Sequence, residues 1–163
     1  SRPRSMTALT FSASSLTSSA NSSFNFNGLS IRAGNLSLIS YLLLVRCDRE
    51  VKVKTRSREF AVPKGELVYV GSCKRDCAKR VGRHFSSEKR KFWHVDYLLE
   101  ECEAVSALLT PLEERELAKL FLDCPYVEGF GSSDDEDNPS HLFLCGFDEA
   151  VRRVVERAKG YSR

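Results

Sequence analysis

The pattern of apolar and polar residues divides the chain near residue 38. Residues 1–37 are rich in Ser, Asn and Thr and lack the apolar periodicity that would bury one face of an element. We therefore expect a disordered N-terminal extension there. Its acid-free, Ser-rich composition fits a flexible tail or an over-extended gene start better than an organelle transit peptide.

Short apolar runs after this extension predict strands. The run 38–45 is almost continuously apolar, which is typical of a central strand buried on both faces. Two later segments, 51–54 and 59–62, alternate with a period of two and predict a half-buried ribbon. A Pro-Lys-Gly break then precedes a further buried strand over 66–71.

Apolar residues at helical spacing dominate the second half of the chain. We expect helices over 76–85, 93–102, 110–122 and 149–158, and strands over 104–109 and 141–144. The third helix should begin at Thr110, because Thr110 and Glu113 match a Thr-x-x-Glu capping box. This mixture, without an internal repeat, predicts one domain of the α/β (α+β) class over 38–163 that ends in a helix.

Composition excludes some protein classes. With 42% hydrophobic and 29% charged residues, the chain is in the range of soluble globular proteins, and its apolar runs are too short for a membrane-spanning helix. Six cysteines are too few for a disulfide scaffold, so we expect reduced thiols and a cytoplasmic protein. A zinc site built from Cys73, Cys77, His84 and His94 is a weaker alternative, because the cysteine spacing is not that of a zinc knuckle.

Charge is distributed unevenly along the chain, although the net charge is only +3. The segment 74–91 carries eight basic residues against two acidic ones, whereas acidic residues gather later in the chain. Basic clusters of this kind bind the phosphates of nucleic acids. The residues expected to contact nucleic acid are Lys74, Arg75, Lys79, Arg83, Lys89, Arg90, Lys91 and His94.

The residue types needed for phosphodiester hydrolysis occur in this order along the chain. Strand tyrosines (Tyr41 and Tyr69) precede a helix with Arg80, and a glutamate-rich helix follows. Hydrolysis requires a group that orients or deprotonates water, a cation beside the phosphate and a carboxylate that holds a hard metal ion. A phenol is a weak base unless cationic neighbours lower its pKa, a role open to the arginine-rich helix.

Several separated motifs resemble a known family. The segment 68–72 (Val-Tyr-Val-Gly-Ser) resembles the second half of the GIY-YIG signature, and 78–84 resembles the arginine helix that follows it. The segments 93–99, 129–134 and 140–143 are similar to the mostly archaeal branch of the GIY-YIG nuclease superfamily labelled Uri-type endonuclease. The resemblance spans roughly residues 38–146 and keeps the order of the motifs.

This resemblance implies a small central antiparallel β-sheet flanked by helices, with the site on one face. By position, Tyr41 and Tyr69 match the two motif tyrosines, Arg80 the helix arginine and Glu114 the metal-binding glutamate. His84, one helical turn after Arg80, is a candidate for proton transfer. The implied cofactor is Mg²⁺ or Mn²⁺, and Glu116 is the alternative ligand because the motif can be registered either way.

The sequence also departs from the family pattern. Ile39 stands where the first motif has glycine. The acidic run 134–138 (Asp-Asp-Glu-Asp-Asn) replaces the paired cysteines of this branch, which leaves that loop no thiol chemistry. The asparagine-bearing last strand of other family members is not evident, and Ser140 or His141 is its possible replacement. Residues expected to line the cleft are Ser132, Ser133, Asp134 and His141.

Two functions follow as expectations. The first is a divalent-metal-dependent endonuclease acting on nucleic acid, DNA rather than RNA, with Tyr41, Tyr69, Arg80, His84 and Glu114 as its catalytic residues. The alternative is a catalytically inactive nucleic-acid-binding module of the same fold, which the altered first motif favours. A protein-interaction domain is the third reading, and it leaves the basic segment unexplained.

Overall fold

A computed structural model of the protein describes residues 9–12, 23–26, 29–32, 37–73, 76–87 and 90–161. Five of the described strands form one antiparallel sheet in the order β1-β8-β4-β7-β9. Their bounds are β1 Leu9–Ser12, β8 Glu103–Thr110, β4 Ser40–Cys47, β7 Gly65–Ser72 and β9 Leu142–Leu144. The hairpins β2–β3 (Ser23–Phe26, Leu29–Arg32) and β5–β6 (Val51–Lys54, Glu59–Val62) pair separately.

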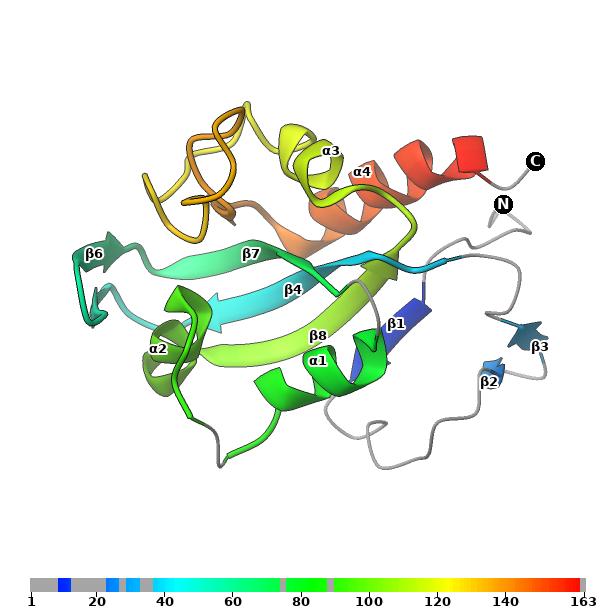
Figure 1. Ribbon diagram of the computed structural model, residues 1–163, viewed down its shortest axis with the longest axis horizontal. Helices are drawn as coiled ribbons and strands as arrows, with labels where there is room; N and C mark the ends of the chain where they lie inside the picture. The colour runs from blue at the N-terminus through cyan, green and yellow to red at the C-terminus, as the bar shows by residue number, and fades with distance from the viewer. Residues whose placement is uncertain are drawn as a thin grey trace.

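Helices cover both faces of the sheet (Figure 1). One face carries α1 (Cys77–His84) and α2 (His94–Glu101), and the other carries α3 (Glu114–Lys119) and α4 (Phe147–Ala158), which continues as a 3₁₀ turn over Lys159–Tyr161. The small antiparallel sheet with helices on both sides confirms the expected mixed α+β class.

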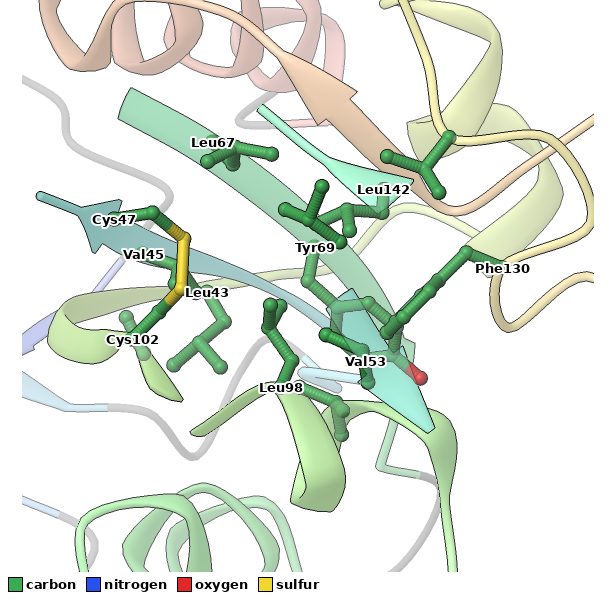
Figure 2. Close-up of a cluster of buried hydrophobic side chains, with 14 of the residues drawn as sticks. Leu43, Val45, Cys47, Val53, Leu67, Tyr69, Leu98, Cys102, Phe130 and Leu142 are labelled. Atoms are coloured by element: carbon green, nitrogen blue, oxygen red, sulfur yellow. A yellow bond between two sulfur atoms is a disulfide. The ribbon is translucent and has the colours of Figure 1, made fainter. Parts of the chain in front are cut away.

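The central strand β4 explains the two-sided core. Because side chains alternate across a strand, its odd and even residues feed different clusters. Tyr41, Leu43 and Val45 join the core beneath α1, α2 and the β5–β6 hairpin (Figure 2), whereas Leu42 and Leu44 pack toward α3 and α4. Strand 38–45 was expected to be buried on both faces, and five consecutive residues from Tyr41 to Val45 are each less than 7% exposed.

Most elements lie within two residues of their predicted bounds, and the third helix, predicted over 110–122, is the exception at both ends. Thr110 is the last residue of β8, and the helix begins at Glu114 with Glu113 as its N-cap. The Thr110 hydroxyl is buried, lies 2.6 Å from the Ser40 hydroxyl and accepts the Leu112 amide proton. The predicted capping box is therefore wrong, because Thr110 is used for a cross-strand hydrogen bond instead.

The N-terminal extension also differs in part from the expectation of disorder over 1–37. The strand β1 pairs with β8 at the edge of the sheet, and β2 pairs with β3. Backbone pairing with an edge strand needs no apolar periodicity, so the sequence pattern gave no indication of it. The other residues before 37 lie outside the described part of the chain.

The cysteines correct a second expectation. Disulfides join Cys47 to Cys102 and Cys73 to Cys77, whereas reduced thiols were predicted. The first connects the end of β4 to the end of α2 inside the core (Figure 2). The prediction failed because counting cysteines does not show which of them the fold brings together, as it does here with Cα separations of 4.6 and 4.8 Å.

Among the described residues, no helix is both long enough and apolar enough to cross a membrane.

Candidate functional site

A cavity of about 1280 Å³ lies where β4 begins and β7 and β8 end. Strands β4 and β7 form its floor. Arg80 of α1 lies on one side, and the start of α3 and the loop before β9 lie on the other. Four of the predicted catalytic residues line it: Tyr41, Tyr69, Arg80 and Glu114. These side chains are up to 73 positions apart in the sequence, so their meeting depends on the sheet topology.

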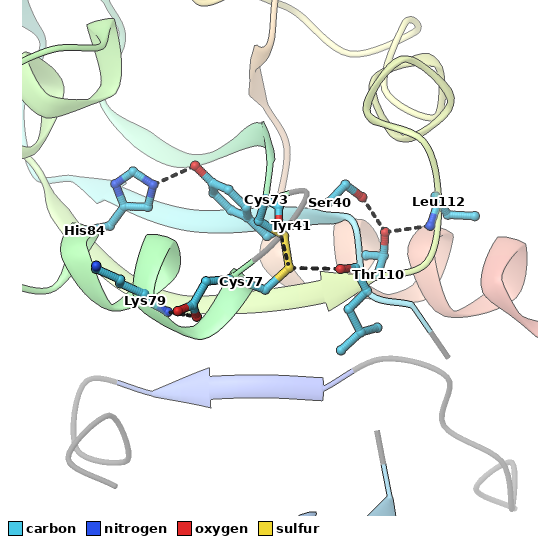
Figure 3. Close-up of a disulfide and its surroundings, with 10 residues drawn as sticks. Ser40, Tyr41, Cys73, Cys77, Lys79, His84, Thr110 and Leu112 are labelled. Carbon is cyan, nitrogen blue, oxygen red and sulfur yellow. Dashed lines mark hydrogen bonds between the residues drawn. A yellow bond between two sulfur atoms is a disulfide. The ribbon is translucent and has the colours of Figure 1, made fainter. Parts of the chain in front are cut away.

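Tyr41 lines the cavity and forms a hydrogen-bonded pair with His84, the fifth predicted catalytic residue, which does not itself line the cavity (Figure 3). The Tyr41 hydroxyl lies 2.6 Å from Nε2 of His84, and both side chains are buried. Gly71 stands opposite Tyr41 in the register of β4 and β7, and a Cβ there would overlap the phenol ring. The motif glycine therefore makes room for the ring that contacts His84.

Tyr69 reaches the same cavity from the next strand. Its ring packs against Phe130 and comes within 3.0 Å of the position a Cβ would take on Gly131, which has a positive φ of 71°. The Gly-Phe-Gly loop thus wraps around Tyr69, and its glycine allows the close approach. The resemblance named this loop as a motif, and its contact with a motif tyrosine gives a physical reason for its composition.

The protonation of both phenols differs from the sequence expectation. Burial raises the pKa of Tyr41 well above 10, with Tyr69 and Glu114 adding to the rise and Arg80 opposing it. Burial likewise raises the pKa of Tyr69, followed by the charge of Glu114. The arginine-rich helix therefore does not lower these pKa values enough to offset burial, and both phenols stay protonated at neutral pH.

Arg80 and Arg83 lie one turn apart on α1 and have different surroundings. Arg80 lines the cavity, with its guanidinium carbon 4.4 Å from the centre of the Trp93 ring. Arg83 donates to both oxygens of the fully buried Asp96, at 2.8 and 2.9 Å. We expected Arg83 to contact nucleic acid, but its guanidinium joins α1 to α2 instead.

Glu114 faces a histidine bracketed by two carboxylates. The Nδ1 atom of His141 lies 3.0 Å from Glu114, and its Nε2 atom lies 2.8 Å from Asp135. Burial acts to lower the pKa of His141, but the two carboxylates outweigh it and raise that pKa above 6.5. When protonated, His141 thus forms an ion pair with the glutamate that the resemblance implies as a metal ligand.

The neighbouring acidic residues separate into distinct roles. Asp135 is 6% exposed and also accepts from the Asn138 amide at 2.6 Å. Glu116, the alternative metal ligand, does not line the cavity and instead pairs with Arg157 of α4. Glu114 is therefore the better placed of the two glutamates.

The residues present fit a hard divalent ion held by one carboxylate. Among the described residues, no group of three or more His, Cys, Asp or Glu side chains could hold a metal by itself. Mg²⁺ commonly takes one or two carboxylates, several waters and the phosphate oxygens of its substrate, so it needs no such group. Glu114, with a side chain 32% exposed at the cavity wall, suits that arrangement.

Of the other predicted nucleic-acid contacts that the structure describes, only His94 lines the cavity. Lys79 and Arg90 are exposed, and Lys91 pairs with Glu100 at 2.8 Å. His94 lines the cavity and accepts the Gly131 amide proton at 3.1 Å, while burial lowers its pKa. The residues that lie outside the described part of the chain are Lys74, Arg75 and Lys89.

Sequence reasoning missed or undervalued three contributors to the site. His141 was expected to line the cleft or to replace the asparagine of the family's last strand, and the buried position of Asp135 within an acidic run was not foreseen. The spacing of six residues between them holds no helical or strand signal, so only the folded loop shows their contact. Ile39 lines the cavity where the family motif has glycine, held by backbone hydrogen bonds to Thr110 and Cys73 at 2.9 Å.

Comparison with known proteins identifies one family, and the description of that family names no activity. No curated protein matches the chain, and no solved structure matches it. A family model described as "Domain of unknown function DUF123" matches residues 40–161, which include every described element of the sheet except β1 and every residue that lines the cavity except Ile39. The chain therefore belongs to the family described as domain of unknown function DUF123.

Proposed function

We propose that this protein is a divalent-metal-dependent endonuclease of the GIY-YIG type that hydrolyses phosphodiester bonds in nucleic acid. The observation that carries the proposal is the presence of Tyr41, Tyr69, Arg80 and Glu114 in one cavity. Phenol, guanidinium and carboxylate can supply the water-orienting group, the cation and the metal ligand that phosphodiester hydrolysis requires, and the GIY-YIG resemblance implies the same residues.

Each group has a distinct task in this proposal. Arg80 binds the scissile phosphate and offsets the negative charge that grows on its oxygens. Tyr69, which keeps its proton, donates a hydrogen bond to the same group. Glu114 would hold Mg²⁺ or Mn²⁺, and the ion would supply charge neutralisation and activation of water.

The Tyr41–His84 pair suits proton transfer better than an isolated phenol does. A phenol with a raised pKa is rarely ionised at neutral pH, so Tyr41 alone would be a poor base. With Nε2 of His84 at 2.6 Å, Tyr41 can pass its proton to the imidazole while it accepts one from the attacking water. The pair thereby keeps a buried phenolate from accumulating, which burial would disfavour.

One basic residue in the cavity and two exposed ones close to it in sequence favour a nucleic-acid substrate. Lys79 and Arg90 are exposed, and Arg80 points into the cavity. Contacts of this kind bind phosphates without reading sequence and weaken steeply with salt. We propose DNA rather than RNA as the substrate.

Glu114→Gln is the sharpest test, with Glu116→Gln as its matched control on the same helix. The purified full chain is incubated with branched, nicked and single-stranded substrates and Mg²⁺ or Mn²⁺, and with a chelator in parallel. We expect metal-dependent cleavage that Glu114→Gln and Arg80→Ala abolish and Glu116→Gln retains. Equal cleavage by the two glutamine variants would refute the assignment of the metal ligand.

One observation favours the alternative of an inactive binding module. Ile39 places an apolar side chain at the cavity wall where the family has glycine, which narrows the approach to Tyr41. Salt-sensitive binding of nucleic acid without cleavage by the wild type in either metal ion would support this alternative and refute the enzyme.

A further inference from the structure

Two adjacent aromatic side chains are exposed at the rim of the cavity. Phe92 is 71% exposed and Trp93 is 39% exposed, and both line the cavity. The other exposed large hydrophobic residues of the described chain, Leu122 and Tyr126, lie away from it. An apolar ring that is 71% exposed contributes little to the core, so the fold alone does not explain Phe92.

The backbone under these two rings is firmly held. The buried carboxylate of Asp96 accepts the amide protons of Phe92 at 2.8 Å and Trp93 at 3.0 Å. The same carboxylate is bound by Arg83, so the rings are tied to both α1 and α2. A buried ion pair is costly to form, and here it fixes the backbone that carries two exposed side chains.

Positive charge surrounds the rings. The guanidinium of Arg80 lies 4.4 Å from the centre of the Trp93 ring, and that of Arg83 lies 4.7 Å from it. Arg83 is also 5.9 Å from the centre of the Phe92 ring. Aromatic faces next to cations are the features that proteins use to stack bases of single-stranded nucleic acid while binding the phosphates between them.

We infer that Phe92 and Trp93 form a stacking site for an unpaired nucleobase next to the phosphate bound by Arg80. The inference rests on the proposed function and deepens it, because it defines the substrate as nucleic acid with unpaired nucleotides at the site of cleavage. A base inside a continuous duplex has both faces covered by its neighbours, so it is not accessible to a protein ring. Single strands, flaps and extruded bases offer that face.

The test compares three oligonucleotides of equal length on the full chain without a divalent metal ion. They are a single strand, the same strand with abasic sites, and its duplex. Trp93 is the only tryptophan of the chain, so quenching of its fluorescence reports stacking directly, and anisotropy of a labelled strand reports affinity. The variants are Phe92→Ala, Phe92→Leu and the control Tyr126→Ala, which removes an exposed aromatic ring outside the cavity.

We expect the single strand to bind more tightly than the abasic strand and the duplex and to quench Trp93. Phe92→Ala should weaken binding of the single strand by about 5- to 160-fold, the range for loss of one base–aromatic stack, and Phe92→Leu should restore little. Tyr126→Ala should bind as the wild type does.

The possible failures separate the two proposals. Equal affinity for the base-bearing and abasic strands, together with an unchanged Phe92→Ala variant, would overturn the stacking site while leaving phosphate binding and cleavage intact. Absence of binding by every oligonucleotide at low salt would overturn both proposals and leave the aromatic pair as a contact for another protein.

Discussion

The same substitution at two arginines one turn apart on α1 should affect different properties of the protein. Arg83 binds the fully buried Asp96, whereas Arg80 lines the cavity and contacts Trp93. We predict that Arg83→Met lowers stability strongly and that Arg80→Met mainly lowers nucleic-acid binding and cleavage. The methionine keeps an apolar chain of similar length, so both variants lose chiefly the guanidinium.

The magnitude follows from the burial of the carboxylate. Breaking a buried ion pair by removing one partner costs about 3 to 5 kcal/mol, because the remaining charge has no counterion. For a protein of this size that loss lowers Tm by about 6 to 20 °C. Removing Arg80 costs at most about 1 kcal/mol, the value of a cation–π contact at a partly exposed site.

The pH dependence of this difference has a defined sign. Burial acts to raise the pKa of Asp96, but hydrogen bonds from Arg83, Trp93 and Phe92 together outweigh it and hold the pKa below 3.8. A lowered pKa in the folded state means that the stabilisation is complete above the unfolded value and is lost as pH falls through the folded one. The stability gap between wild type and Arg83→Met should therefore be full at pH 7 and narrow below about pH 4.

Urea denaturation of wild type, Arg83→Met and Arg80→Met at pH 7 and at pH 3.5 measures these differences. Similar unfolding free energies for the two variants at pH 7 would refute the distinct roles of the two arginines. A gap that widens on acidification would refute the charge-based explanation.

Three further variants test other contacts. Gly71→Ala should lower the free energy of unfolding by about 1 to 3 kcal/mol in urea denaturation and reduce cleavage, because the new methyl group displaces the Tyr41 ring. Unchanged stability and cleavage would show that the ring is not held there. The double change Cys47→Ala with Cys102→Ala should lower the free energy of unfolding by about 4 kcal/mol, because the unfolded chain is no longer constrained by the loop that the disulfide closes. Thiol labelling of the unreduced, unfolded wild type should count two free cysteines rather than six. His141→Gln should lower stability most below about pH 6.5 and progressively less as pH rises through the raised pKa of His141. A decrease in Tm that is the same at every pH would contradict the ionic role of His141.

The sequence predicted what local patterns determine. The alternation at 51–54 and 59–62 gave both strands of the β5–β6 hairpin with their observed bounds, and apolar runs located β4 and β7. Local rules failed at Thr110, where a capping pattern competed with a cross-strand hydrogen bond to Ser40. Propensity does not include partners that lie 70 residues away.

The candidate site was predictable only as a set of residues. The resemblance supplied Tyr41, Tyr69, Arg80 and Glu114, and the cavity brings them together. Their protonation could not be predicted, because burial has a larger effect on the phenols than the nearby arginine. The role of Arg83 was also hidden, since a basic helix looks uniform in sequence and only the fold shows which arginine meets a buried carboxylate.

The ion pair between Arg83 and Asp96 links the two halves of the proposed site. On one side α1 carries Arg80 and the His84 partner of Tyr41, and on the other Asp96 fixes the loop with Phe92. A substrate that stacks a base on Phe92 and places its phosphate beside Arg80 depends on the distance between these two elements. Loss of Arg83 should therefore weaken cleavage even at temperatures where the variant is fully folded. Both the stability of the fold and the positioning of the substrate depend on this ion pair. Loss of Arg80 should chiefly remove charge from the cavity, because the buried ion pair between Arg83 and Asp96 still joins α1 to α2.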